Sequence, residues 1–180
     1  TFLLQNDGAQ FEVAQVETKP AQKNPTAPFT TSTLQQEASR KLYFSVSKTM
    51  TLAQRLYEAG LITYMRTDSV NLSQEAIKQA KNQIEKQFGK DYVKTRVFST
   101  KNKSAQEAHE AIRPTDLSRT RIVADADQAR LYELIWKRTI ASQMSSSILE
   151  LTQLKIKASS HSEIFQAKGE VLLFEGFLSL

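Results

Sequence analysis

The chain has 180 residues, 40% of them hydrophobic, with 24 Lys and Arg, 19 Asp and Glu, and no cysteine. This length allows one domain or two small ones, and no apolar run is long enough to span a membrane. Without cysteine, these residues hold no disulfide, thiol nucleophile or cysteine-ligated zinc. No secretory signal is visible either, so we expect a cytoplasmic protein.

The positive charge is concentrated in the middle of the chain. Residues 28–144 contain 19 Lys and Arg against 12 Asp and Glu, whereas the two flanks together contain 5 against 7. A basic middle indicates an anionic partner such as nucleic acid. An ordinary solvated surface would account for the same counts.

Both ends of the chain have strand patterns. Thr1–Val16 indicates a hairpin around Asn6-Asp7-Gly8, and the prolines of residues 18–28 indicate a linker. After Met144, apolar and polar residues alternate, and residues 163–180 give further strand signals.

The middle of the chain is helical by its periodicity. Helices are predicted to begin near Ser32, where Gln35 would complete a capping box, and to cover Ser47–Ala59 before Gly60. Further helices are predicted at Ser73–Phe88, Ala105–Ile112 and Asp125–Met144.

The expected fold is therefore α+β and multidomain. A mainly helical domain of residues 28–145, with helix-turn-helix character, would be inserted into a β-rich domain formed by residues 1–27 and 146–180.

The segment Thr63–Ser69, with the sequence TYMRTDS, is the most informative stretch. Tyrosine is a rare nucleophile that conserves the energy of a broken phosphodiester in a covalent phosphotyrosine. In an extended segment Tyr64, Arg66 and Asp68 would share one face. Arg66 would then neutralise phosphate oxygens with its forked donors, and Asp68 would orient it or handle a proton.

The helix before this segment contributes two more polar side chains. Gln54 and Glu58 are four residues apart, so they lie on one helical face close to Tyr64 in the sequence. Glu58 is a second candidate for orienting Arg66 or handling a proton.

A structural interpretation of the same residues stays open. A tyrosine in a strand is usually a half-buried aromatic, and Arg66 with Asp68 would make an ordinary surface ion pair. His109, between two glutamates, is more often part of a surface charge cluster. Asp125-Ala126-Asp127 is assigned to helix capping rather than to a metal.

Three segments together resemble the type IA DNA topoisomerases, and most narrowly the bacterial topoisomerase I branch. They are residues 56–69 (LYEAGLITYMRTDS), 27–36 (APFTTSTLQQ) and 105–114 (AQEAHEAIRP), which occur in the family's order. The resemblance implies that the helical domain corresponds to the family's catalytic domain III and the β flanks to its arch-forming domain II.

The resemblance also implies residue roles. Tyr64 would form a 5′-phosphotyrosyl link to one strand while Arg66 positions the scissile phosphate. His109 would contact a phosphate or the Asp68 carboxylate. The family relaxes negatively supercoiled DNA by cutting one strand, passing another through the gap and resealing. The remaining residues in matched segments are a supporting shell and a further DNA-binding arginine: Gln54, Glu58, Thr63 and Arg113.

The family's Mg²⁺ is held by a Toprim domain, which we do not find in this sequence. We therefore expect a segment of a longer polypeptide, working with its missing domains at the bacterial nucleoid. We expect no metal site here, binding mainly to single-stranded DNA, and no cleavage by the isolated chain. Tyr43, Phe44 and Tyr57 are each open to base stacking or to core packing. The competing hypothesis is a non-enzymatic DNA-binding module with a helix-turn-helix.

Overall fold

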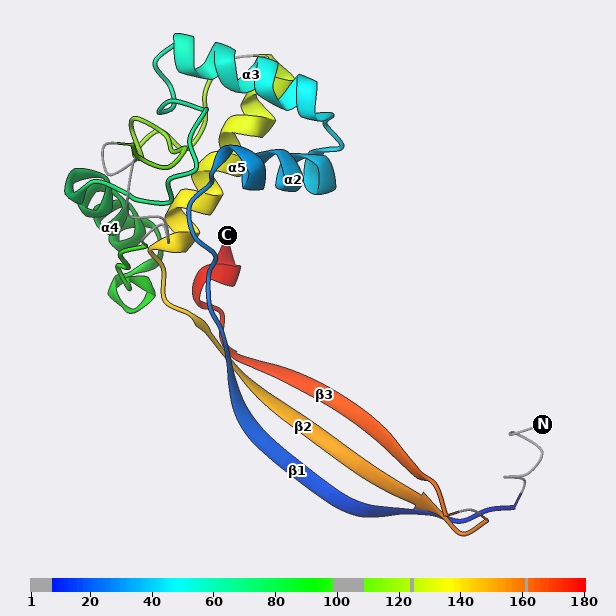
Figure 1. The fold of residues 1–180 in the computed structure, drawn as a ribbon. Helices are drawn as coiled ribbons and strands as arrows, with labels where there is room; N and C mark the ends of the chain where they lie inside the picture. Colours follow the sequence, from blue (N-terminus) through cyan, green and yellow to red (C-terminus); the bar gives the residue numbers. More distant parts are fainter. Residues whose placement is uncertain (1–7, 99–108, 124, 161) are drawn as a thin grey trace. The chain divides into compact units, whose positions relative to one another are not determined.

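The computed structural model describes residues 8–98, 109–123, 125–160 and 162–180. Its contacts divide the chain into two compact units, which are treated separately (Figure 1). One unit comprises Thr1–Lys23 and Ser146–Gly176, and the other comprises Asn24–Ser145 and Phe177–Leu180.

The first unit is an antiparallel sheet of three strands in the order β1-β2-β3. The strands are β1 (Phe11–Lys23), β2 (Ser147–Ala158) and β3 (Ile164–Phe174). β1 pairs with β2 along its whole length, from Phe11 opposite Ala158 to Lys23 opposite Ser147. The two ends of the chain therefore meet in one sheet.

For the N-terminal part, one prediction is wrong and another lies partly outside the described residues. Residues 11–16 form the first half of β1 and pair with β2, whereas the other arm predicted for their hairpin is not among the described residues. Residues 18–23 are not a linker, because β1 continues through Pro20. Proline is tolerated there because β1 is an edge strand, where one side of the backbone needs no partner.

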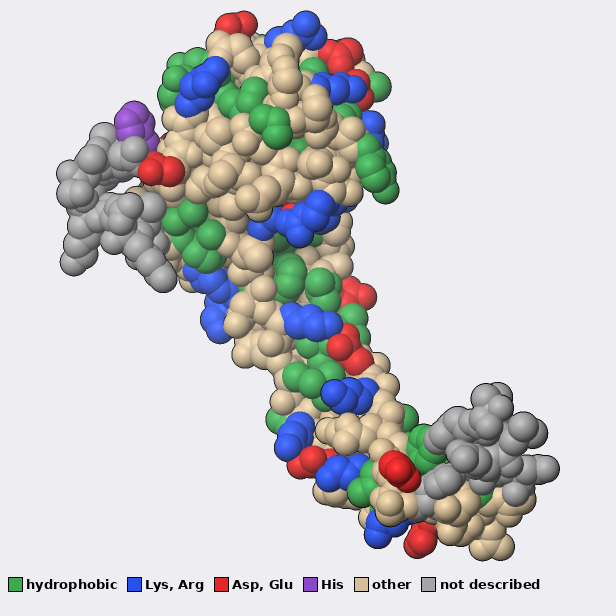
Figure 2. All heavy atoms as spheres, turned by 45° about the vertical axis from the view of Figure 1, so that its right-hand side comes forward, with side chains coloured by type: hydrophobic (Ala, Val, Ile, Leu, Met, Phe, Trp, Pro, Cys, Tyr) green, Lys and Arg blue, Asp and Glu red, His purple; other side chains and the backbone are tan. Residues whose placement is uncertain are grey.

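Cross-strand pairs, rather than a deep core, stabilise this sheet. Large apolar side chains of all three strands are exposed, and Figure 2 shows them among alternating basic and acidic side chains. Lys23 and Glu170 form an ion pair of 2.6 Å, and the rings of Phe11 and Phe165 meet edge to face with centroids 5.9 Å apart. Both pairs link the outer strands β1 and β3 across the central strand β2.

The second unit is helical, as predicted for the middle of the chain. It contains α2 (Thr31–Leu42), α3 (Val46–Glu58), α4 (Gln74–Phe88) and α5 (Ala126–Ser142), with short 3-10 turns at Lys90–Tyr92 and Gly176–Ser179. α2 and α3 are joined by three residues (Figure 1). The buried face of α5 packs against the other helices, and its core side chains are Leu131, Tyr132, Ile135, Trp136 and Ile140.

The helix starts are set by local hydrogen bonds. Asp125 accepts from the amides of Asp127 and Gln128, so its predicted capping role is confirmed. α2, however, begins at a box between Thr30 and Thr33, not between Ser32 and Gln35. The predicted helix Ala105–Ile112 is wrong over its described part: residues 109–112 are extended, and Ile112 bridges Phe29.

The last residues of the chain belong to the helical unit, whereas we had expected them in the β-rich domain. The amide of Phe177 donates to the carbonyl oxygen of Ser145 at 2.9 Å, and Phe177 and Leu180 pack against the helical core. Among the described residues, none of the helices has the length and hydropathy needed to cross a membrane.

Candidate active site

The Tyr64 segment is not part of a regular strand, and its backbone bends at Thr63, Met65 and Arg66. Its side chains nevertheless alternate: Tyr64, Arg66 and Asp68 are exposed, whereas Met65 and Thr67 are buried. Tyr64 is 43% exposed, so solvent reaches the ring. All three candidate side chains, Tyr64, Arg66 and Asp68, are therefore open to solvent, and the buried residues between them anchor the segment.

Thr31, at the start of α2, holds this segment from one side. The Thr31 amide donates to the Thr67 carbonyl oxygen at 2.8 Å, and the Thr67 amide donates to Thr31 Oγ1 at 2.9 Å. The same hydroxyl lies 2.8 Å from the Met65 carbonyl oxygen, to which it can donate. The sequence offered only a threonine-rich helix start here, so this role of Thr31 was missed.

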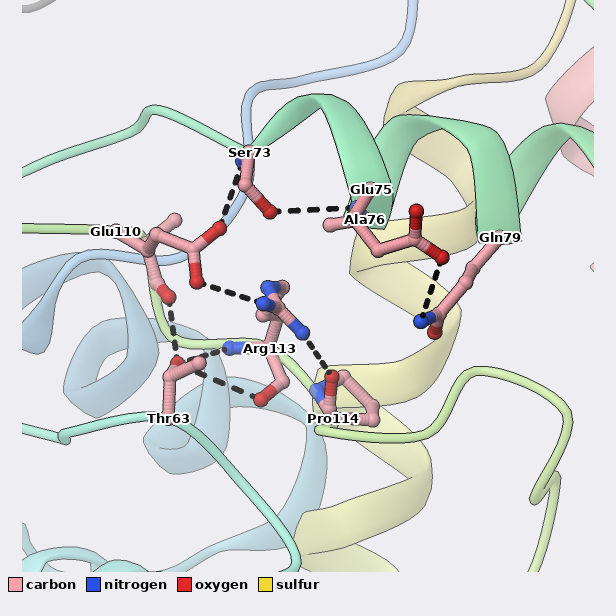
Figure 3. A network of polar contacts seen from close by, with 9 residues as sticks. Thr63, Ser73, Glu75, Ala76, Gln79, Glu110, Arg113 and Pro114 are labelled. Atoms are coloured by element: carbon pink, nitrogen blue, oxygen red, sulfur yellow. Dashed lines mark hydrogen bonds and ion pairs between the residues drawn. The ribbon is translucent and has the colours of Figure 1, made fainter.

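Residues 109–114 hold the segment from the other side (Figure 3). Thr63 Oγ1 donates to the Ala111 carbonyl oxygen at 2.6 Å and accepts from the Arg113 amide at 3.0 Å. The Thr63 amide donates to the Arg113 carbonyl oxygen, and the Ile112 amide donates to that of Phe29. All three segments singled out in the sequence are thus hydrogen-bonded to one another through their backbones.

The Arg113 side chain is held by an ion pair and a hydrogen bond within this network. Its guanidinium pairs with Glu110 at 2.6 Å and donates to the Pro114 carbonyl oxygen at 2.9 Å, and its side chain is only 12% exposed. Glu110 also accepts from the Ser73 amide, which ties the start of α4 to the network (Figure 3). This geometry favours a structural role for Arg113 over the predicted contact with DNA.

The charge of Glu110 is stabilised within this network. Burial by itself would raise the pKa of the Glu110 carboxyl. Hydrogen bonds from Arg113 and Ser73, together with the arginine's charge, outweigh burial and lower the pKa below its ordinary value of 4.5. Glu110 is therefore an ionised structural group rather than a proton donor.

His109 is exposed at the edge of the same segment. Within the described residues, its imidazole makes no hydrogen bond or ion pair with Tyr64, Arg66 or Asp68. The expected contact with the Asp68 carboxylate is thus not made in this structure. Exposure leaves the imidazole able to meet a phosphate that approaches from solvent.

α3 supplies the third wall of the site. Gln54 Nε2 donates to Glu58 Oε1 at 2.6 Å, as their spacing predicted. A hollow of about 450 Å³ is lined by these two residues, by Arg66 and by neighbouring residues of α3. Gln54, Glu58 and Arg66 therefore face one space, which suits a phosphate held by the guanidinium.

Tyr57, on the same helix, was not predicted to support the nucleophile. Its ring meets that of Tyr64 edge to face, with centroids 5.3 Å apart and an interplanar angle of 67°. This arrangement is favoured between aromatic rings. The only signal in the sequence was its position beside Glu58 in the segment that carries the resemblance.

The described residues do not form a metal site. Within residues 8–98, 109–123, 125–160 and 162–180, there is no group of three or more His, Asp or Glu side chains that could hold a metal ion. Asp125 caps α5, and Asp127 pairs with Lys48 and Arg130. The described residues therefore do not fit the Mg²⁺ that the resemblance implies.

Known proteins match this chain in both sequence and fold. The family model described as DNA topoisomerase covers residues 2–180. DNA topoisomerase 1 of Zymomonas mobilis is 54% identical over 97% of this chain, and that of Mycolicibacterium smegmatis is 51% identical over 95%. The structure of full-length topoisomerase I from Thermotoga maritima superposes on 94% of the chain with a TM-score of 0.82 and 39% identity.

These relatives are much longer than the chain. It spans 14% of the Zymomonas protein, 19% of the Mycolicibacterium protein and 29% of the Thermotoga chain. The match extends over both units, including the β flanks, where the resemblance in sequence was weak. It confirms the resemblance to the type IA enzymes: the chain belongs to the DNA topoisomerase family, as a segment similar to bacterial DNA topoisomerase 1.

Proposed function

We propose that these residues carry the nucleophile of a type IA topoisomerase that relaxes negatively supercoiled DNA. Tyr64 Oη attacks the phosphorus of one strand, forms a 5′-phosphotyrosyl bond and displaces the 3′ oxygen. The phenol loses its proton, and the departing 3′ oxygen gains one. After another strand has passed through the gap, the 3′ hydroxyl attacks the phosphotyrosine and restores both groups.

One observation carries this proposal: Tyr64 is exposed, as are Arg66 and Asp68, on a segment held from both sides by hydrogen bonds. Nucleophile and guanidinium belong to one rigid piece of backbone, so a phosphate bound by Arg66 lies close to Tyr64. A guanidinium stabilises both the phenolate and the charged phosphate oxygens.

The neighbouring residues take supporting roles. Glu58, fixed by Gln54, lines the hollow with Arg66 and would orient the guanidinium. His109 would bind a phosphate, and Thr63 would fix the backbone beside the nucleophile. Arg113 would stabilise this backbone through Glu110 rather than bind DNA.

The rest of the polypeptide would complete the enzyme. A Toprim domain would supply the Mg²⁺ that assists departure of the 3′ oxygen, because the described residues offer no fitting site. The basic helical unit would bind single-stranded DNA, and the protein would then act in the cytoplasm, at the bacterial nucleoid.

Tyr64→Phe in the complete polypeptide tests the proposal. The change removes the nucleophilic oxygen but keeps the ring that packs against Tyr57. We expect no covalent adduct trapped by denaturant and no relaxation of supercoiled DNA, with single-strand binding retained. The matched control is Tyr57→Phe, which removes the hydroxyl of the adjacent ring and should leave the adduct. An adduct that persists in Tyr64→Phe would refute the assignment.

The second candidate is a DNA-binding module without enzymatic activity. The observation in its favour is the pair α2 and α3, joined by three residues as in a helix-turn-helix. Under this hypothesis, Tyr64→Phe would change neither adduct formation nor binding, since wild type would form no adduct.

A further inference from the structure

Tyr43 stands apart from the other aromatic residues of the helical unit. It ends α2 with φ 60° and ψ 32°, in the left-handed region, and is the only non-glycine residue with positive φ among those described. Its side chain is 89% exposed. Glycine or asparagine would adopt this backbone with less strain, so the fold gives no reason for a tyrosine here.

The other two aromatic residues considered for base stacking already pack against protein side chains. Phe44 is buried in the core, and Tyr57 packs against Tyr64. Tyr43 has no ring contact with any residue that the structure describes. Of the three aromatic residues that the sequence left open to base stacking, Tyr43 is the one whose ring is free.

Basic side chains surround this turn. Lys48 of α3 and Arg130 of α5 lie over the ring of Phe44, with the ammonium nitrogen 4.4 Å and the guanidinium carbon 5.2 Å from its centroid. Arg40 and Lys41 occupy the last turn of α2. The carboxylates that pair with these cations are Glu37 and Asp127, so four positive charges face two negative ones.

We propose that Tyr43 and these cations form a second contact for single-stranded nucleic acid, separate from Tyr64. A base stacks on the exposed ring, and phosphates on either side bind Arg40, Lys41, Lys48 and Arg130. Free aromatic faces within a basic surface are the usual means of binding single strands without sequence preference. The inference rests on the proposed function, because it assumes that the helical unit meets DNA.

The separation between Tyr43 and Tyr64 indicates what this contact would do. α3 begins three residues after Tyr43 and ends six residues before Tyr64. Its 13 residues span roughly 20 Å. A DNA strand bound at Tyr43 would therefore be held at a distance from the phosphodiester that Tyr64 attacks. This second contact would keep one cleaved end from dissociating.

The experiment measures binding of a fluorescent oligothymidine to the 180-residue chain. Tyr43→Gly should weaken binding roughly five- to 150-fold, the range found for loss of one stacking partner. Because glycine relieves the strained backbone, the thermal midpoint should not fall. Tyr43→Phe should bind as wild type does. Tyr43→Asn keeps the left-handed backbone but lacks the ring, so it should reproduce the loss. A loss seen with glycine but not with asparagine would mean that glycine perturbs the turn, and would overturn the stacking role.

A matched pair tests the role of charge. Arg40 and Lys81 are both exposed and both pair with a glutamate on their own helix. Arg40→Gln should weaken binding and flatten its salt dependence, because a phosphate contact is lost. Lys81→Gln, on α4, should change neither.

The results separate the inference about Tyr43 from the proposed function. Binding that is unchanged in Tyr43→Gly overturns this inference alone. A wild-type chain that does not bind single strands overturns it together with the DNA-binding part of the proposed function, whereas the cleavage part is judged by Tyr64→Phe. A fall in the thermal midpoint of the complete polypeptide carrying Tyr43→Gly, with binding unchanged, would show that the ring packs against another domain instead.

Discussion

Two tyrosines of the helical unit show how environment separates a structural phenol from a reactive one. Tyr132 is buried on α5 and donates to the Arg119 carbonyl oxygen at 2.7 Å, and burial raises its pKa to about 12. Tyr64 is exposed, lies two residues before an arginine, and packs edge to face against the ring of Tyr57. Only the second arrangement leaves the oxygen accessible to a DNA backbone.

The Tyr57 ring should restrict the orientation of Tyr64. Edge-to-face pairs contribute about 0.5–1.5 kcal/mol, so Tyr57→Leu should slow adduct formation by roughly two- to twelvefold in the complete polypeptide. Single-strand affinity should not change, because Tyr57 is not proposed to touch DNA. Single-turnover cleavage and binding measured together check this, and Tyr57→Phe should restore the rate. Equal rates for Tyr57→Leu and wild type would refute a positioning role.

The Glu110–Arg113 pair should make stability depend on pH. Because the folded-state pKa of Glu110 lies below its ordinary value of 4.5, the pair stabilises the fold above that value and stops doing so as pH falls through the lowered pKa. Glu110→Gln should cost about 1 kcal/mol at pH 7, and the deficit should shrink below pH 4.5.

Urea unfolding at several pH values measures this effect. Glu75→Gln is the matched control, since Glu75 is an exposed carboxylate of α4 that accepts only from Gln79. A deficit of Glu110→Gln that is independent of pH would mean that packing, not charge, is lost.

At the level of elements, the site depends on hydrogen bonds between segments that are distant in the sequence. Residues 27–31, 63–69 and 109–113 are short and irregular, and their backbone groups find partners in one another rather than in helices. Buried backbone groups need such partners, because leaving one unpaired is costly. The threonines at 31 and 63 complete this pairing with their hydroxyls.

Thr31→Val tests this connection. It keeps the shape of the side chain but leaves the Thr67 amide without its acceptor, which should cost about 1–3 kcal/mol. The measurements are urea unfolding and hydrogen exchange of the Thr67 amide, which should become faster. Thr51→Val is the control, because the Thr51 hydroxyl bonds only within α3, to the Ser47 carbonyl oxygen. Equal stability of the two variants would show that α2 does not secure the Tyr64 segment.

Elements that depend on interactions between residues close in the sequence were predicted well, whereas elements that depend on distant residues were not. α4 and α5 were predicted close to their observed bounds, because apolar spacing and the caps at Ser73 and Asp125 are local signals. Residues 18–23 of β1 were mistaken for a linker, because their partners on β2 lie more than 120 residues away. Residues 109–112 were given to a helix because their extended form depends on bonds to Phe29 and Thr63.

At the scale of the whole molecule, the chain holds the proposed nucleophile and a basic helical unit, but its described residues hold no metal cluster. The relatives that it matches are five to seven times as long, since it covers 14–20% of them. Binding and cleavage should therefore be separable in this protein.

The isolated chain should bind single-stranded DNA without cleaving it. With Mg²⁺ present, denaturant should trap no covalent adduct, because no described group assists the departing 3′ oxygen. Binding should weaken with added salt by about 0.7 log units per tenfold increase for each phosphate contacted. A Tyr64-dependent adduct would contradict the first expectation, and affinity that is insensitive to salt would contradict the second.

The sequence by itself determined the family and led to the proposed chemistry, because the order of Tyr64, Arg66 and Asp68 and the helical periodicities lie in residues close together along the chain. Only the tertiary structure decided which side chains are available. It buried Arg113 against Glu110, placed Tyr57 on Tyr64 and left Tyr43 in solvent. A side chain becomes buried, or gains a bonding partner, where segments distant in the sequence pack together. The spacing of residues within one segment does not show which distant segment will pack against it.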